Sequence, residues 1–281
     1  MKIAVIGSGI SGLSASYYLS KKYIVDLFEK EDHFGGHSYT LDLEYEKDNR
    51  KKISVDIGFI VFNYLTYPNL INFFKENKIQ IEKSNMSYSV SVKNLNIEYC
   101  GKGINGIFSN KLNLINFKFI KMFFDIISFY KKSDKLISIE ENKTLGEYLI
   151  EQKVSKYFIN YHIIPMASAI WSMPPTKVSQ MPLIFFIKFF QNHGLFKLKN
   201  RPQWYTIANR SRTYVNKVLE KISGEYYKNY PINKIIRHSN GVKIYYGKIS
   251  EYFEYDKVVL ATHADEALSL IESPRTMKMK F

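Results

Sequence analysis

The residues best suited to chemistry lie near the start of the chain, where glycines and an acidic residue have a defined spacing. Gly7, Gly9 and Gly12 form a GxGxxG pattern, and Glu29 follows 22 residues after the first glycine. Glycine lacks the Cβ atom that would keep the backbone away from a pyrophosphate, and a carboxylate accepts hydrogen bonds from ribose hydroxyls. The pattern predicts binding of a dinucleotide whose ribose carries no 2′-phosphate. A chance glycine-rich turn is the alternative.

The flanking segments indicate the elements that position these residues. Residues 2–6 are a short β-branched apolar run, typical of a buried parallel strand. Residues 13–21 have helical spacing, and residues 24–28 are a second apolar run that ends at Glu29. The helix would begin at the glycines, so its free N–H groups would face the phosphates. This strand, turn, helix and strand are the context that a GxGxxG pattern requires.

A second glycine segment bears on which dinucleotide is bound, because GxGxxG alone does not separate NAD from FAD. The segment EKEDHFGGHSYT, residues 29–40, resembles the acid-then-GG signature of flavoproteins in the amine oxidase and phytoene desaturase superfamily. In that superfamily the second motif usually reads G-G-Arg and lies along the FAD pyrophosphate. His37 stands where the arginine is usual. The alternative interpretation of Gly35-Gly36 is a plain turn.

Further stretches extend the resemblance over residues 1–272. They are VDIGFIVFN (55–63), TYP (66–68), MASAIWSMPP (166–175), NHGL (192–195), RPQW (201–204) and VVLATHAD (258–265). Together they resemble the bacterial predicted NAD/FAD-binding proteins of the amine-oxidase superfamily, whose genes often lie beside cyclopropane-fatty-acid synthase-like genes.

The resemblance implies an α/β fold in which a Rossmann-type, amine oxidase-like FAD-binding domain carries an inserted, mostly helical α+β substrate domain. The FAD-binding domain would comprise residues 1–68 and 205–272, the substrate domain residues 69–204, and the tail residues 273–281. Within the insert, residues 70–77 and 117–130 have helical spacing, and residues 145–150 follow Thr144, a predicted N-cap. Asn240-Gly241 predicts a hairpin turn before a strand over residues 241–246.

The motifs and the resemblance together give a candidate cofactor site, with Ile232 near the adenine and Phe59 near the flavin ring. No general base, nucleophile triad or metal-ligand set stands out, so no catalytic residue is assigned and no metal is expected. Three residues of the family-like stretches are candidates to face the substrate, Trp171, His193 and Trp204, with packing in the core as the alternative for each. The predicted cofactor-binding residues are Gly7, Gly9, Ser11, Gly12, Glu29, Lys30, Gly35, Gly36, His37, Gly58, Phe59, Ile232, Ala261 and Thr262.

Two departures from the family pattern stand out. The family usually has two glycines where this chain has ANRSR, residues 208–212, so we expect Asn209 to adopt a left-handed conformation there. Relatives also continue well beyond this length, and the missing part normally supplies the last FAD segment. The chain is therefore expected to be C-terminally short: a truncated product, or half of a split protein whose C-terminal half is supplied separately.

The net charge of +14 comes from 34 lysines and only six arginines against 26 acidic residues. Arginine is the residue favoured for reading bases and phosphates, so no nucleic-acid partner is expected. Compositional drift toward lysine is one explanation of the charge. Contact with an anionic membrane or an acidic substrate is another, and residues 117–129 and 183–190, which interleave phenylalanine with lysine, would supply an amphipathic face for a membrane.

The remaining sequence features concern the compartment. The lone Cys100 excludes an internal disulfide, and no apolar window reaches the 18 residues of a membrane span. These features predict a cytoplasmic protein, peripheral to the inner membrane face if the amphipathic surface is used.

Three functions remain open at this point. The first is an FAD-dependent oxidoreductase that removes a hydride from an acyl lipid or an amine. The second is a flavoprotein half that lacks activity without its C-terminal segment. The third is an NAD-binding module of another kind, which the GG segment disfavours.

Overall fold

The computed structural model describes residues 1–45, 51–132, 143–197, 201–247 and 251–273. The chain divides into two compact units. Unit 1 comprises residues 1–62, 67–84 and 205–281, and unit 2 comprises residues 63–66 and 85–204. Most of the predicted tail, residues 274–281, lies outside the described residues.

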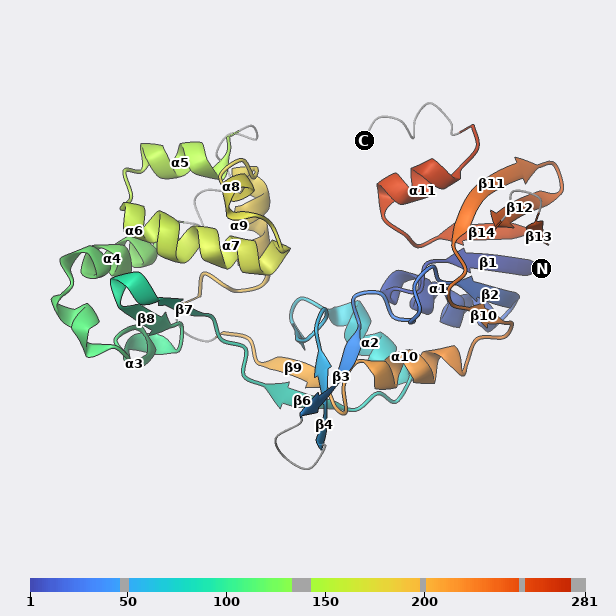
Figure 1. Cartoon of the computed structure of the whole chain (residues 1–281), viewed down its shortest axis with the longest axis horizontal. Helices are drawn as coiled ribbons and strands as arrows, with labels where there is room; N and C mark the ends of the chain where they lie inside the picture. Colours follow the sequence, from blue (N-terminus) through green and yellow to red (C-terminus); the bar gives the residue numbers. More distant parts are fainter. Residues whose placement is uncertain (46–50, 133–142, 198–200, 248–250, 274–281) are drawn as a thin grey trace. The chain divides into compact units, whose positions relative to one another are not determined.

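Unit 1 is built on a parallel sheet in the order β10-β2-β1-β14 (Figure 1). The order brings β14, from the end of the chain, beside β1, and Ile6 pairs with Leu260. The helix α1 follows β1 directly and leads into β2, as expected of a right-handed crossover between parallel strands. The strands are β1 (Lys2–Ile6), β2 (Ile24–Phe28), β10 (Tyr226–Tyr227) and β14 (Lys257–Leu260).

The two faces of this sheet pack against different layers because alternate side chains of a strand point in opposite directions. Ile3 and Val5 of β1 pack with helices, whereas Ala4 and Ile6 pack with an antiparallel sheet in the order β11-β12-β13. The helices are α1 (Ile10–Ser20), α2 (Pro68–Glu76) and α10 (Arg212–Leu219), and the antiparallel strands are β11 (Ile232–His238), β12 (Gly241–Tyr246) and β13 (Glu251–Tyr255).

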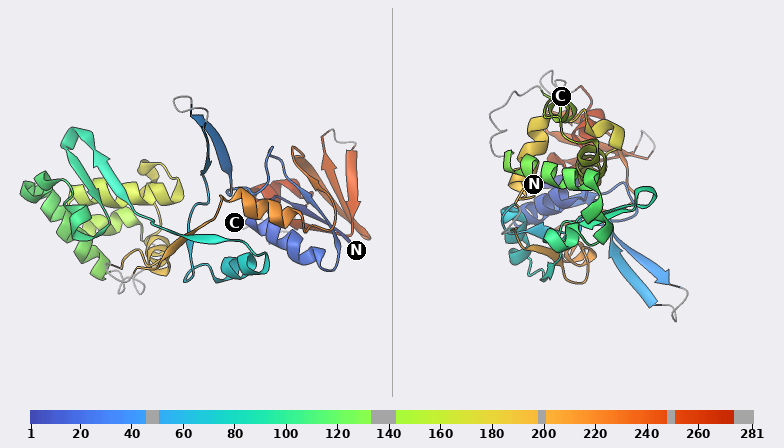
Figure 2. Two further views of the ribbon diagram at one scale, coloured as in Figure 1. Left: turned by 90° about the horizontal axis from the view of Figure 1, so that it is seen from below. Right: turned by 90° about the vertical axis from the view of Figure 1, so that its left-hand side faces the viewer.

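Other short elements complete unit 1. The hairpin of β3 (Thr40–Tyr45) and β4 (Lys51–Asp56) stands out from the rest of the unit (Figure 2). The short strands β5 (Phe62–Asn63), β9 (Trp204–Ile207) and β6 (Ile81–Ser84) pair in the order β5-β9-β6, and the end residues Asn63 and Trp204 belong to unit 2. The helix α11 (Ala264–Leu270) follows β14.

Unit 2 is mostly helical, with one hairpin of β7 (Ser89–Val92) and β8 (Ile97–Cys100). Its core is rich in phenylalanine, and α4 and α9 contribute more of its buried residues than the other elements do. The helices are α3 (Gly103–Ile107), α4 (Phe117–Lys132), α5 (Leu145–Glu151), α6 (Lys156–Phe158), α7 (Ile164–Trp171), α8 (Pro175–Val178) and α9 (Leu183–Asn192). The remaining turns are the 3₁₀ turns η1 (Lys93–Leu95) and η2 (Lys111–Ile115) and the π-helical turn η4 (Ile159–Ile163).

The predicted domain boundaries differ from the division into units at two places. Residues 63–66 are predicted to belong to the FAD-binding domain, but they belong to unit 2. Residues 69–84 are predicted to belong to the substrate domain, but α2 and β6 belong to unit 1. Phe73 and Phe74 of α2 are the reason, because both are buried in the core that covers the parallel sheet.

The hairpin turn predicted at Asn240-Gly241 is displaced by one residue. His238 pairs with Gly241, so the turn residues are Ser239 and Asn240, and Gly241 is the first residue of β12. A Cβ atom on Gly241 would lie 2.6 Å from the carbonyl oxygen of Tyr255. The glycine is therefore required by the close approach of β13 and not by the turn.

In the described part of the chain, every helix is too short or too polar to cross a membrane.

Candidate functional site

The first glycine loop connects β1 to α1 and packs against the end of β14. Gly7 has φ of +96°, which an L side chain rarely adopts, and a Cβ atom there would lie 2.7 Å from the carbonyl oxygen of Ala261. A Cβ atom on Gly12 would collide with the carbonyl oxygen of Gly7. Gly9, by contrast, has open space on the side where its Cβ atom would lie. The loop is therefore tightly packed on one side and leaves room for a ligand at Gly9.

Glu29 directly follows β2, lies beside this loop and is 6% exposed. Its Oε2 atom accepts hydrogen bonds from the backbone N–H of Ser8, at 2.9 Å, and from the Ser8 hydroxyl. Its Oε1 atom accepts one from the backbone N–H of Glu31, at 3.0 Å. These donors fix the carboxylate and leave acceptor capacity for a further hydroxyl.

The second glycine segment packs directly on the first. The backbone N–H of Gly35 donates to the Ser8 hydroxyl at 3.1 Å. A Cβ atom on Gly36 would lie 3.0 Å from the Cα atom of Gly9. Ser8 therefore links Glu29 to the second glycine segment. Sequence reasoning did not identify Ser8, because it occupies an unspecified position of the GxGxxG pattern.

The segment after the second glycine pair is held by Phe59 and Tyr214. The backbone N–H of Phe59 donates to the carbonyl of His37 at 2.6 Å, and a Cβ atom on Gly58 would collide with that carbonyl. Ser38 and the buried Tyr214 share a hydrogen bond of 2.6 Å between their hydroxyls. Burial raises the pKa of Tyr214 to about 12, so its hydroxyl stays protonated.

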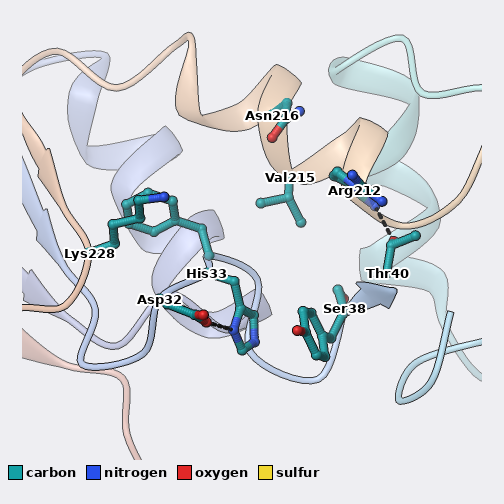
Figure 3. A pocket seen from close by; sticks show the side chains of 10 residues that line it. Asp32, His33, Ser38, Thr40, Arg212, Val215, Asn216 and Lys228 are labelled. Carbon is teal, nitrogen blue, oxygen red and sulfur yellow. Dashed lines mark hydrogen bonds and ion pairs between the residues drawn. The ribbon is translucent and has the colours of Figure 1, made fainter. Parts of the chain in front are cut away.

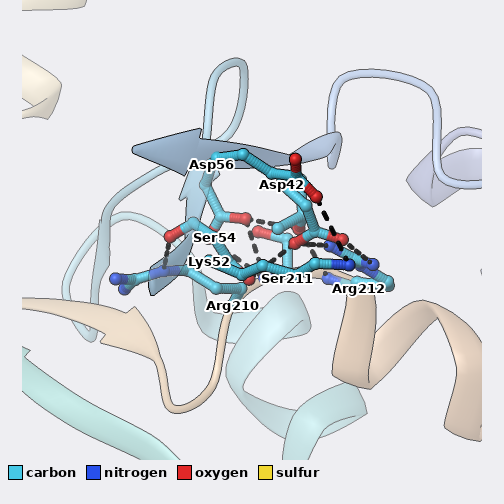
Figure 4. A network of polar contacts seen from close by, with 9 residues as sticks. Asp42, Lys52, Ser54, Asp56, Arg210, Ser211 and Arg212 are labelled. Atoms are coloured by element: carbon cyan, nitrogen blue, oxygen red, sulfur yellow. Dashed lines mark hydrogen bonds and ion pairs between the residues drawn. The ribbon is translucent and has the colours of Figure 1, made fainter. Parts of the chain in front are cut away.

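A polar network joins the β3–β4 hairpin to the start of α10 (Figure 4). Both carboxylate oxygens of Asp56 accept from the backbone N–H of Ser211, at 3.1 and 3.0 Å, and the Ser211 hydroxyl donates to the carbonyl of Phe59. Arg212 donates to both carboxylate oxygens of Asp42, at 2.8 and 2.7 Å, and these bonds lower the pKa of Asp42. The network fixes the strand end that leads to Phe59.

These elements enclose a cavity of about 980 Å³ within unit 1. Its wall includes the first glycine loop, Glu29, the second glycine segment, the start of β11 and the end of β14. All the predicted cofactor-binding residues line it except Gly12 and Gly58, which pack behind the wall. The lining residues that sequence reasoning did not name are Ile6, Ser8, Ile10, Phe28, Glu31, His33, Ser38, Tyr67, Leu70, Tyr214, Tyr230, Pro231, His263, Glu266, Ser269 and Leu270.

Two features of this wall could not be read from local sequence. The side chain of Lys30 forms an ion pair of 2.7 Å with Glu266 of α11, which is 236 residues away in the chain. The rings of His37 and His263 lie 6.4 Å apart, edge to face. Both pairs form only because the parallel sheet places β14 beside β1.

The three candidate substrate-facing residues belong to unit 2 and do not line this cavity. Trp171 packs against Phe189, with ring centroids 4.7 Å apart, and His193 stacks on the same ring at 4.0 Å. The Nδ1 atom of His193 also lies 2.9 Å from the carbonyl oxygen of Phe189. Trp204 is half-buried at the start of β9. The structure brings Trp171 and His193 to one phenylalanine ring in a packing role.

A second cavity, of about 320 Å³, lies beside the first (Figure 3). Asp32 and His33 line one side of it, and Val215 and Asn216 of α10 line the other. The hydrogen bond with His33 lowers the pKa of Asp32. In the described residues, no group of three or more histidine, cysteine or acidic side chains is placed to hold a metal ion.

The comparisons with known proteins match this geometry. Residues 5–76 match the family described as an NAD(P)-binding Rossmann-like domain. No curated protein matches the sequence. Cyclohexylamine oxidase from Brevibacterium oxydans superposes with a TM-score of 0.69 at 16% identity, over 96% of this chain and 59% of that one. The chain has the amine-oxidase fold.

Two further solved structures share the amine-oxidase fold with this chain. Putrescine oxidase bound to putrescine superposes with a TM-score of 0.70 at 15% identity, over 98% of this chain and 62% of that one. An oxidoreductase from Methanosarcina mazei superposes with a TM-score of 0.59 at 18% identity, over 96% of this chain and 61% of that one. The chain thus spans about three fifths of the length of these proteins. The expected architecture, a Rossmann-type domain with a largely helical insert, is confirmed.

Proposed function

We propose that the chain is an FAD-dependent oxidoreductase that removes a hydride from an organic substrate. One observation carries the proposal: a single cavity is lined by the GxGxxG loop, Glu29, the second glycine segment and the end of β14. A site for NAD requires only the GxGxxG loop and Glu29. The resemblance to flavoproteins rests on the second glycine segment, which therefore favours FAD. The amine-oxidase fold supports the same choice.

The residues present fit FAD. The open space at Gly9, opposite Gly36, is a cradle that a Cβ atom would fill, and a pyrophosphate fits there. The first N–H groups of α1 and the partial positive charge of its N-terminus would bind the phosphate oxygens. Glu29, already fixed by Ser8 and Glu31, would accept from a ribose hydroxyl.

When bound, the flavin supplies the hydride acceptor. The residues of this chain would bind the cofactor and orient the substrate. Ile232 and Tyr230 would contact the adenine end of the cavity, and Phe59 would supply an apolar wall that excludes water near the reacting bond. The substrate class is an amine or an acyl lipid. The names of cyclohexylamine oxidase and putrescine oxidase favour an amine.

The test is whether the purified chain binds FAD at this cavity. We expect the visible absorption of an oxidised flavin, and added FAD at a hundred times Kd should raise the free energy of unfolding by about 2.7 kcal/mol. The variant Gly9→Val should lose both effects. Gly9 has φ of −60° and ψ of 179°, which valine adopts without strain, and its Cβ atom would meet nothing in the unliganded chain. The variant should therefore fold normally while its side chain occupies the pyrophosphate space.

The control is Lys22→Ala, an exposed lysine after α1 that should change neither flavin binding nor stability. A folded chain that is stabilised by NAD and not by FAD would refute the proposal in favour of an NAD-binding module. A folded chain that binds neither would refute it in favour of a half that requires a further segment.

A further inference from the structure

The solvent-facing side chains of one part of unit 2 are unusually apolar. Among the described residues, the five most exposed large hydrophobic side chains include four from the segment 104–124: Phe117 at 89%, Ile115 at 75%, Ile104 at 71% and Phe124 at 62%. Leu112 and Leu114 of η2 are also more than half exposed. Contiguous exposed apolar side chains on a folded unit mark a surface that meets a partner.

The packing of α4 shows that these exposed side chains do not belong to a partly opened core. Its buried face carries Phe119, Met122 and Ile126, which pack into the core of unit 2. Phe117 and Phe124 lie on the opposite stripe, seven residues or two turns apart. A surface helix normally presents charged residues on that stripe. The solvent-facing stripe of α4 therefore carries two large apolar side chains, Phe117 and Phe124, beside Lys121 and Ser128.

The charged side chains within this segment all have one sign, and acidic residues lie at its two ends, Glu98 and Asp125. The segment 99–124 contains no aspartate or glutamate and carries four exposed lysines, Lys102, Lys111, Lys118 and Lys121. Within the described residues, none of the four forms an ion pair with a carboxylate. Lysine stems cover apolar surface while their ammonium groups reach outward, the arrangement found where a protein meets the headgroup layer of a membrane.

We propose that this surface, residues 102–124 of unit 2, docks onto an anionic lipid bilayer. Ile115 and Phe117 would enter the acyl boundary, and Lys118 and Lys121 would contact lipid phosphates. The positive charge of the lysines is complementary to anionic lipid headgroups. It disfavours a second copy of the same surface as the partner, because lysines without acidic residues between them would repel each other. The proposal is independent of the enzymatic activity.

The residues of the proposed membrane-binding surface differ from those expected from the sequence. In the stretch 183–190, Leu183, Phe186, Ile187 and Phe190 are buried in the core of unit 2. One side of that stretch therefore belongs to the core, while Phe185, which is 50% exposed, and Lys188 face the solvent. The exposed face begins earlier than residue 117, because it includes η2 and α3.

The test is co-sedimentation of the intact chain with vesicles of phosphatidylcholine alone and of phosphatidylcholine mixed equally with phosphatidylglycerol. We expect binding only to the anionic vesicles, weakening as salt rises. The variant Ile115→Ser should lower the partition coefficient about tenfold. The double variant Lys118→Gln/Lys121→Gln should lower it by about fivefold per lysine at low salt.

Matched controls come from another part of unit 2, where α5 and α8 lie away from α3 (Figure 1). Ile150 on α5 is 74% exposed, almost the same as Ile115, and Lys177 on α8 is exposed. Ile150→Ser and Lys177→Gln should bind as the wild type does. All these side chains are exposed, so circular dichroism should show the same fold throughout.

Three outcomes would overturn the proposal. The first is absence of binding to anionic vesicles at low salt. The second is an equal loss of binding in Ile115→Ser and Ile150→Ser, which would show nonspecific adsorption. The third is concentration-dependent dimerisation that Phe117→Ser removes while vesicles stay unbound, which would show that a second copy covers the surface.

Discussion

Acidification should destabilise unit 2 through one buried histidine, His162, which is 6% exposed and lies in the π-helical turn η4. Its two ring nitrogens are both engaged. The hydroxyl of Tyr99 donates to the carbonyl of Tyr161 at 2.7 Å and lies 3.0 Å from Nδ1, so it accepts the proton of that nitrogen. The hydroxyl of Tyr130 lies 2.9 Å from Nε2 and donates to it. The pattern assigns a neutral imidazole with its proton on Nδ1.

Protonation of His162 would place a positive charge in a buried site where its contacts are neutral tyrosine hydroxyls. Burial lowers the pKa of His162 to about 3, and the positive charge of Arg201 contributes in the same direction. The unfolded chain has an ordinary histidine pKa of about 6.5. Below about pH 6.5 the unfolded state therefore binds a proton that the folded state does not bind. The free energy of unfolding falls as the pH drops through this range.

The magnitude follows from the two pKa values. Between about pH 8 and pH 4.5, the lost contribution is about 3 kcal/mol. That is a large fraction of a typical unfolding free energy of about 5–15 kcal/mol. Most carboxylates remain ionised above about pH 4.5, so the histidine dominates the change in that window.

Urea unfolding at a series of pH values measures this effect, and tryptophan fluorescence assigns it to the correct unit, because both tryptophans lie in unit 2. The comparison protein is His162→Gln, whose amide can still donate and accept but does not titrate. Its unfolding free energy should be lower at neutral pH and nearly independent of pH down to about pH 4.5. The other five histidines are present in both proteins, so the difference in slope isolates His162. Parallel pH dependences in the two proteins would refute the reasoning.

Six further substitutions, at three places in the fold, test local features by urea unfolding. Thr144→Ala should lower the stability of unit 2 by about 1 kcal/mol, because Thr144 and Glu147 form a reciprocal capping box, and Thr144→Ser should restore it. Asn209→Gly should change stability by less than about 0.5 kcal/mol and Asn209→Val should lower it by about 1–2 kcal/mol, because φ is +62°. Asp26→Asn should cost unit 1 about 2–3 kcal/mol, since the buried carboxylate accepts from the hydroxyl of Tyr255 at 2.7 Å; Tyr255→Phe should cost about 1 kcal/mol.

The parts of the fold that could be predicted from the sequence are those whose determinants are local. The GxGxxG loop lies between a strand and a helix, as its spacing predicts, and the capping box at Thr144 forms with Glu147. In both cases a few neighbouring residues satisfy each other's backbone groups. Most of the predicted cofactor-binding residues line one cavity, because the motifs that name them follow elements of one sheet.

The parts that could not be predicted depend on contacts between distant segments. Nothing near Ser8 in the sequence indicates that its hydroxyl would link Glu29 to Gly35. The ion pair of Lys30 with Glu266 needs the strand order of the sheet. Periodicity likewise predicts a helix at α2 without saying which core its apolar face would cover.

The segment at residues 208–212 shows how the chain forms a turn without the glycines that are usual in the family it resembles. Asn209 adopts the expected left-handed conformation, and Arg210 also has a positive φ, of 77°. Each such residue costs about 1–2 kcal/mol relative to an ordinary conformation. Three interactions stabilise the turn against this cost. Asp56 accepts from the N–H of Ser211, and Arg210 donates to the carbonyl of Ser54. Arg212 donates two hydrogen bonds to the carboxylate of Asp42.

The hydrogen bonds to the part-buried Asp56 act most strongly against the strain of the two left-handed residues, because the pair of Arg212 with Asp42 is about half exposed and is weakened by solvent. The same interactions fix Ser211, whose hydroxyl donates to the carbonyl of Phe59 on the wall of the large cavity. The conformation of this turn is therefore set by Asp56 and the β3–β4 hairpin, and not by the intrinsic preference of residues 208–212. A glycine pair is one way to make the turn, and a strained turn held by a carboxylate is another. The second way also ties the hairpin to the cavity wall.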